Sequence, residues 1–101
     1  MVRFSLILAP EAEEESREAF LWYRRRDPRV GARFEDELTA ALDRVADAPE
    51  EGAEIELGVR RILLAGRFPY GVLYAIEPGR VVVLAVMHLR RRPGHWRSRK
   101  P

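Results

Sequence analysis

Hydrophobic positions in this chain follow a period of two at the start, a helical period in the middle and apolar runs toward the end. Over residues 3–8 alternate positions are apolar, which is typical of a strand with one buried face. Residues 10–26 and about 30–46 then show helical spacing, and Asp27-Pro28 ends the first helix. Because only a few residues join the helices, the sequence predicts an antiparallel helical hairpin. The apolar stripe of the second helix consists of Val30, Phe34, Leu38, Ala41, Leu42 and Val45.

Three aliphatic and β-branched runs follow the helices. They cover residues 59–64, 70–76 and 81–87, and turn residues at 68–69 and 77–80 separate them. Consecutive strands with short connections pair antiparallel. The order β-α-α-β-β-β therefore predicts a two-layer α+β fold, in which an N-terminal strand precedes a helical hairpin packed on an antiparallel C-terminal sheet.

Length and composition indicate one folded domain spanning residues 1–101. A chain of this size has room for a single core. The absence of cysteine excludes disulfides and thiolate zinc sites and fits a reducing compartment. No apolar stretch approaches the roughly 20 residues that span a bilayer, and the N-terminal stretch is too short for a signal sequence. We therefore expect a cytoplasmic protein.

The net charge of +2 hides a strong segregation of charge along the chain. Residues 1–58 hold 8 arginines and 15 acidic residues, whereas residues 59–101 hold 9 arginines, 1 lysine and a single acid. Such asymmetry indicates that the basic half binds a polyanion or an acidic protein, although halves that fold together also neutralise each other. The predominance of arginine favours bidentate contacts to phosphate or carboxylate.

The last apolar run ends at His88 and opens into a cationic tip that contains Trp96. By strand alternation His88 shares a face with Val82, Leu84 and Val86. It is either a half-buried structural histidine or a proton donor on an open sheet face. The seven-residue spacing between the two histidines does not match common metal-ligand patterns, so we expect no metal and no cofactor. Trp96 is either a stacking residue or a plug for the sheet edge, and a lone aromatic among arginines favours the plug.

Two arginines and two glutamates are candidates for chemistry beside His88. Arg60 and Arg61 point to opposite faces of their strand, so one of them reaches the open face. An arginine there would bind a phosphodiester and stabilise developing charge, and Glu54 or Glu56 would act as a base. These residues are compatible with phosphodiester cleavage without being specific to it.

Several local motifs, in their order and spacing, resemble those of the ParE-like branch of the RelE/ParE superfamily of toxins. No single motif is diagnostic, but the resemblance covers nearly the whole chain. The matching stretches are residues 9–13 (APEAE), 19–23 (AFLWY), 31–38 (GARFEDEL), 58–64 (GVRRILL), 67–74 (RFPYGVLY) and 88–96 (HLRRRPGHW).

The resemblance implies the toxin of a type II toxin–antitoxin module, held inactive by a cognate antitoxin whose C-terminal segment folds as it wraps the toxin. An acidic, disordered peptide would be attracted to the basic half. Trp22 lies off the buried stripe of the first helix, and exposed aromatics on a small domain indicate an interface. The expected antitoxin contacts are Phe20, Trp22 and Tyr23.

The superfamily divides by target. ParE-like members trap DNA gyrase without chemistry of their own, whereas RelE-like members cleave mRNA in the ribosome with basic residues and sometimes a Glu base and a His acid. The single lysine of this chain, Lys100, departs from the lysine-rich RelE pattern, so gyrase inhibition is the preferred hypothesis. A ribonuclease built on Glu56, Arg61 and His88 and an inactive toxin-derived binding module are the alternatives. The predicted gyrase contacts are Arg90, Arg91, Arg92, His95, Trp96 and Arg97.

Overall fold

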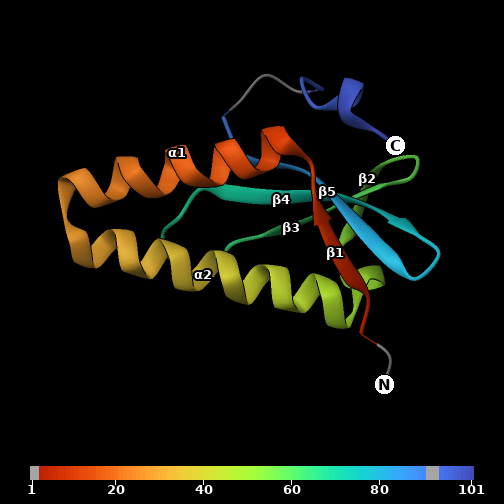
Figure 1. The fold of residues 1–101 in the computed structure, drawn as a ribbon, viewed down its shortest axis with the longest axis horizontal. Helices are drawn as coiled ribbons and strands as arrows, with labels where there is room; N and C mark the ends of the chain where they lie inside the picture. Colours follow the sequence, from red (N-terminus) through yellow and green to blue (C-terminus); the bar gives the residue numbers. More distant parts are fainter. Residues whose placement is uncertain (1–2, 91–93) are drawn as a thin grey trace.

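The computed structural model, which describes residues 3–90 and 94–101, contains a helical hairpin laid on a five-stranded sheet (Figure 1). The α+β class, the N-terminal strand and the helical hairpin are therefore confirmed. The helices are α1 (Pro10–Arg26) and α2 (Pro28–Asp47). The strands are β1 (Ser5–Leu8), β2 (Ala53–Glu56), β3 (Val59–Leu63), β4 (Tyr70–Glu77) and β5 (Arg80–His88). Two short 3-10 helices are η1 (Pro49–Glu51) and η2 (Arg97–Arg99).

Asp27 separates the two helices, as the sequence predicts. Its backbone N–H donates to the Tyr23 carbonyl at 3.0 Å, and its carboxylate caps α2 by accepting from the Arg29 N–H at 2.9 Å. Pro28 occupies the first position of α2, where no N–H is needed, so the helix begins two residues before the predicted Val30. In the part of the chain that the structure describes, no helix has the length and apolarity needed to cross a bilayer.

The sheet is mixed, with the strand order β1-β5-β4-β3-β2. β1 pairs parallel with the first half of β5, and the other neighbours pair antiparallel. The helical hairpin provides the long connection that a parallel pair requires, and short turns connect the antiparallel strands. The sequence pattern does not predict β2, because its residues, Ala-Glu-Ile-Glu, carry little apolar character. Pairing with β3 at the edge of the sheet is what makes this segment a strand.

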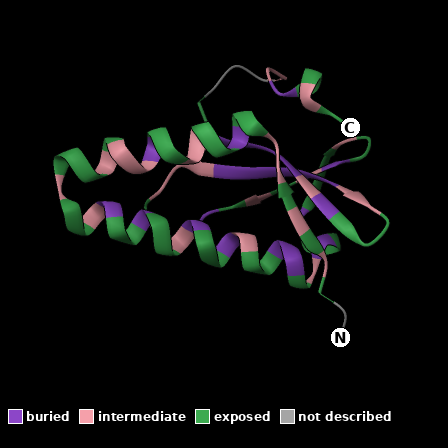
Figure 2. Ribbon diagram, viewed as in Figure 1, coloured by how far each residue is buried: buried purple, intermediate pink, exposed green. Residues whose placement is uncertain are grey.

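A β-bulge in β5 exchanges the faces to which its side chains point. Tyr74 pairs with Val83 while Leu73 pairs with Ala85, so Leu84 is an additional residue in the strand. Both faces of the central strands are buried (Figure 2). The core between the helices and the sheet includes Phe34, Leu38, Ala41, Val45, Val72, Tyr74, Val81, Val83 and Val86. The opposite face gathers Val59, Leu73, Ala75, Val82, Leu84, Ala85, Met87 and Trp96.

Candidate functional site

The C-terminal segment, residues 94–101, packs against the sheet face that the helices leave uncovered. Trp96 is 4% exposed and joins Leu84 and Met87 in the apolar cluster on that face. The tryptophan is therefore a hydrophobic plug, and its ring is not accessible to a partner while the segment is docked.

Glu15 of α1 anchors this segment to the edge of β5. β1 covers only the first half of β5, so the backbone groups beyond it require other partners. The Glu15 carboxylate accepts hydrogen bonds from Val86 N at 3.1 Å and from Arg99 Nη1 at 2.9 Å, and it lies 3.3 Å from His95 Nε2. Arg99 also donates to the Leu84 carbonyl at 3.1 Å. The Glu15 and Arg99 side chains, each 12% exposed, thus satisfy the strand edge and hold the segment in place.

The same segment also bonds to the opposite edge of the sheet. Arg97 Nε lies 3.1 Å from both carboxylate oxygens of Glu56, and Lys100 Nζ donates to the Leu57 carbonyl at 3.3 Å. The Arg97 side chain remains 61% exposed, so its ion pair adds at most about 1 kcal/mol. Its guanidinium is open to a partner.

The predicted target contacts are therefore not equivalent. Arg90 and Arg97 are exposed, His95 and Trp96 face the protein, and Arg91 and Arg92 lie outside the described residues.

His88 lies on the helix-facing side of the sheet, which corrects the predicted face. The bulge at Leu84 reverses the alternation, so His88 shares its side with Val86 but not with Leu84. Its ring contacts Tyr70 edge-on with centroids 5.3 Å apart, and its Nδ1 accepts a hydrogen bond from Arg90 N at 3.1 Å. The histidine thus joins the last strand to the start of the basic tip.

Glu56 and Arg61 lie on the other face of the sheet. Together they line a pocket of 210 Å³, and Arg61 stands in register with Leu73 of the far-face cluster. The sheet separates them from His88, so the structure does not bring the three candidate catalytic residues to one site. Among the described residues, no three histidine or acidic side chains cluster as metal ligands do.

The two adjacent arginines of β3 have different surroundings. Arg60 points to the helix side, where its Nη1 donates to the Gly52 carbonyl at 2.7 Å and the Glu50 carbonyl at 3.1 Å. These bonds tie β3 to η1 and to the residue that follows it. Arg61 is exposed, so it is the arginine that reaches the open surface.

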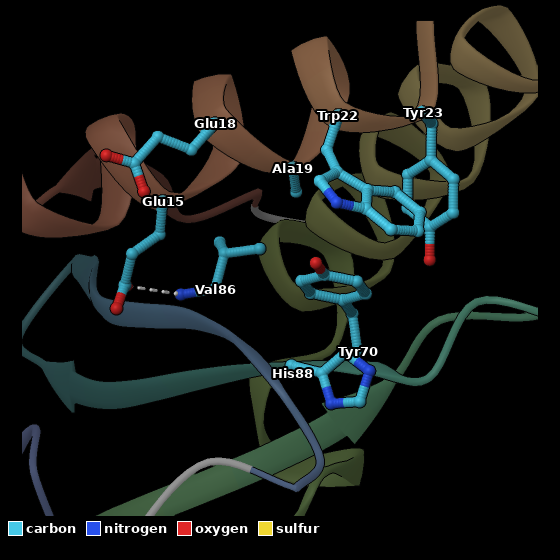
Figure 3. A pocket seen from close by; sticks show the side chains of 8 residues that line it. All are labelled: Glu15, Glu18, Ala19, Trp22, Tyr23, Tyr70, Val86 and His88. Atoms are coloured by element: carbon cyan, nitrogen blue, oxygen red, sulfur yellow. Dashed lines mark hydrogen bonds between the residues drawn. The ribbon is translucent and has the colours of Figure 1, made fainter. Parts of the chain in front are cut away.

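Two of the three predicted antitoxin contacts line a groove of 370 Å³ between α1 and the sheet. Trp22 and Tyr23 lie above Tyr70 and His88 in this groove (Figure 3). Trp22 is 47% exposed, as the helical periodicity predicts. Phe20 faces a separate groove between α1 and α2. The three aromatic residues therefore belong to two surfaces of α1.

Tyr23 forms the rigid part of this groove. Its ring packs at 5.2 Å from Phe34 and at 5.0 Å from Phe68, centroid to centroid. Burial raises the pKa of the Tyr23 hydroxyl above its ordinary value of 10.0. The packed Tyr23 ring therefore presents a fixed apolar surface, and the half-exposed Trp22 stands beside it.

Sequence reasoning missed Glu15 and Arg99. In the sequence, Glu15 is one of four glutamates that complement the positive end of the first helix dipole, and Arg99 belongs to a run of basic residues. Their ion pair joins positions separated by 84 residues. No local pattern reports a contact of this range.

The strand, the helical hairpin and the antiparallel strands, with a basic C-terminal segment, define a small α+β fold. The sequence profile described as "ParE toxin of type II toxin-antitoxin system, parDE" matches residues 6–93. The chain belongs to this ParE toxin family, which confirms the resemblance.

Two further similarities agree with this assignment. Toxin RelE1 of Caulobacter vibrioides is 29% identical over 86 residues, which cover 84% of this chain and 92% of the relative. A solved structure described as a chromosomal ParDE TA system from P. aeruginosa matches with a TM-score of 0.72 at 16% identity, over 85% of this chain and 96% of the other. At that identity the structural likeness shows the fold alone.

Proposed function

We propose that this chain inhibits DNA gyrase through its basic C-terminal tip, residues 90–97, without catalysing a reaction. The observation that carries the proposal is the anchoring of the segment. Trp96 and the Glu15–Arg99 pair hold it on the sheet while Arg90 and Arg97 remain exposed. Cations on an ordered segment lose less freedom on binding than cations on a free tail, and this favours affinity.

The separation of the candidate catalytic residues supports a function without chemistry. General acid–base catalysis requires the acid and the base within hydrogen-bond reach of the same reacting atoms. Glu56 and Arg61 line a pocket on one face of the sheet, and His88 lines a groove on the other. Membership of the ParE family agrees with this reasoning.

A cognate antitoxin is the proposed partner, and the groove between α1 and the sheet is its proposed docking site. Trp22 stands half-exposed at the groove with apolar Ala19 and Val86 beside it. Tryptophan is among the residue types most enriched at binding hot spots. Phe20 offers a second contact in the groove between the helices. Because gyrase is a cytoplasmic target, the proposal places the protein in the cytoplasm.

A gyrase supercoiling assay with purified toxin, with and without antitoxin, tests this function. We expect inhibition by the wild-type chain, relief of inhibition on adding antitoxin, and loss of inhibition in a variant with three tip arginines changed to Gln. The control changes three exposed arginines elsewhere and should inhibit like the wild type. The test substitutions are Arg90→Gln, Arg91→Gln and Arg92→Gln, and the control substitutions are Arg3→Gln, Arg17→Gln and Arg80→Gln.

The absence of inhibition by folded wild-type protein would overturn the proposal. Ribosome-dependent RNA cleavage that is lost in Arg61→Gln would then establish the ribonuclease alternative. Folded protein that does neither, and that permits normal growth at high levels, would be a binding module.

A further inference from the structure

Six exposed arginines lie at or near the turn of the helical hairpin. Figure 1 shows this turn at the opposite end of the molecule from the C-terminus. The arginines come from the end of α1, the start of α2 and the loop between β3 and β4. We call them the hairpin-tip cluster: Arg24, Arg25, Arg26, Arg29, Arg33 and Arg67.

Packing brings these stretches together. A Cβ atom added at Gly31 of α2 would lie 2.9 Å from the Arg24 Cα, so the two helices are in direct backbone contact here. Arg33 and Arg67 line one surface pocket of 590 Å³, which also contains the acid Glu37. The cluster therefore gathers at one end of the molecule, although its members are up to 43 residues apart in the sequence.

Most of this positive charge is not neutralised locally. Within the described residues, Arg29 is the only member with an ion pair closer than 4.0 Å, to Asp27 at 3.3 Å. Arg26 instead donates to the Trp22 carbonyl at 3.2 Å and places its guanidinium 3.3 Å from the Trp22 ring centroid.

Folding stability does not account for the cluster. The arginines at the end of α1 complement its dipole, but Arg29 lies in the first turn of α2, where a positive charge is unfavourable and where its pairing with the capping Asp27 offsets only its own charge. Arg33 and Arg67 add further like charge from neighbouring segments. Local rules of stability are broken mostly where a protein binds something, so the cluster indicates a ligand with many negative charges.

We propose that the hairpin-tip cluster binds the sugar–phosphate backbone of duplex DNA, independently of the C-terminal segment. Arginine binds phosphate through paired, planar hydrogen bonds. Apart from Trp22, which Arg26 covers, the large exposed hydrophobic residues of the described chain lie outside residues 22–33 and 65–69, so the surface offers few apolar anchors to a folding peptide partner. The guanidinium of Arg26 occupies a face of the Trp22 ring, so this ring is a poor platform for stacking unpaired bases.

Fluorescence anisotropy with a labelled mixed-sequence duplex of about 20 base pairs, titrated between about 50 and about 200 mM salt, tests the proposal. The variant combines Arg25→Gln, Arg33→Gln and Arg67→Gln, one from each stretch of the cluster. Because each phosphate contact contributes about 0.9 to the salt slope, its slope should be shallower by about 2 to 3, and its affinity at low salt at least about tenfold weaker.

The matched control for this variant is the triple Gln variant of Arg3, Arg17 and Arg80, which has the same net charge. Each of these arginines pairs with an acid outside the cluster, so the control should keep the wild-type slope. Equal losses in the two variants would overturn the proposal by showing an effect of net charge alone. Tighter binding of the wild type to poly-glutamate or to the single strand than to the duplex would overturn the choice of occupant.

A measurement on the wild-type protein does not depend on how the variants fold. Phenylglyoxal modifies exposed arginines, and peptide mass spectrometry reports each position. Duplex DNA should protect Arg33 and Arg67 from modification while leaving Arg3 and Arg80 reactive. Unprotected Arg33 and Arg67 at saturating duplex would refute the proposal, whatever the gyrase assay shows.

Discussion

Replacing Glu15 by Gln should loosen the C-terminal segment from the sheet. The Glu15 carboxylate bonds to Arg99 Nη1 at 2.9 Å and to Val86 N at 3.1 Å, and the Glu15 and Arg99 side chains are each 12% exposed. A hydrogen bond to a charged group contributes about 1.5–3 kcal/mol and a neutral one about 0.5–1.5 kcal/mol, so loss of the charge costs about 1–2 kcal/mol. Since 1.4 kcal/mol is a factor of ten, the undocked fraction should rise about 5- to 30-fold.

Trp96 reports this undocking directly. It is 4% exposed when docked, and in a Trp22→Phe background it is the single tryptophan of the chain. We expect acrylamide to quench its fluorescence more efficiently in Glu15→Gln, with a shift of emission to longer wavelength. The thermal unfolding midpoint should fall by less than it would if the whole protein lost about 1–2 kcal/mol of stability, because only the segment separates from the sheet.

Glu14→Gln is the matched control for this experiment. Glu14 is the adjacent residue of α1, its side chain is 58% exposed, and it pairs with Arg17 at 4.0 Å. Its replacement should leave the quenching of Trp96 unchanged. Equal quenching in the Glu14 and Glu15 variants would refute the reasoning, because docking would then not depend on the carboxylate at the edge of β5.

Two further predictions concern stability. Tyr74→Phe removes the hydroxyl that donates to the Pro49 carbonyl at 2.6 Å, and it should lower the free energy of unfolding in urea by about 1–3 kcal/mol. Burial raises the pKa of Tyr74 above 10.0, so the stability difference between the wild type and Tyr74→Phe should shrink as the pH rises beyond that value. A difference that stays constant with pH would contradict the burial of a neutral Tyr74 hydroxyl. The backbone hydrogen bond from Arg29 lowers the pKa of Asp27 below 3.8. The ionised Asp27 carboxylate therefore stabilises the fold above that pH, and this contribution is lost as the pH falls through the folded-state pKa. Asp27→Asn should therefore unfold with a weaker dependence on acid, and identical acid profiles for the two proteins would disprove this contribution.

The elements that the sequence predicts correctly carry local signals. Asp27 ends one helix and caps the next through bonds to residues two and four positions away, and the apolar stripe of α2 repeats within each turn. The strands β3, β4 and β5 are rich in aliphatic and β-branched residues and are bounded by turns. Chain neighbours decide such features, so their side chains reveal them.

The features that the sequence misses or predicts incorrectly depend on strand pairing. β2 forms because β3 offers it a partner, and its own residues do not require a strand. The bulge at Leu84 comes from the register between β4 and β5 and transfers His88 from the predicted face to the helix side. A register shift of one residue exchanges the faces of a strand, and an apolar run that is buried on both sides contains no alternation to mark it.

The sequence by itself therefore determined the fold class, the helical hairpin, the ParE resemblance and the concentration of positive charge toward the C-terminus. The tertiary structure alone decided where that charge lies. It docks Trp96 and Arg99 on the sheet, leaves Arg90 and Arg97 exposed, and assembles the hairpin-tip cluster from three separate stretches. The physical reason is range: propensity and periodicity act over a few residues, whereas the ion pair between Glu15 and Arg99 spans 84 and exists only once the sheet has formed.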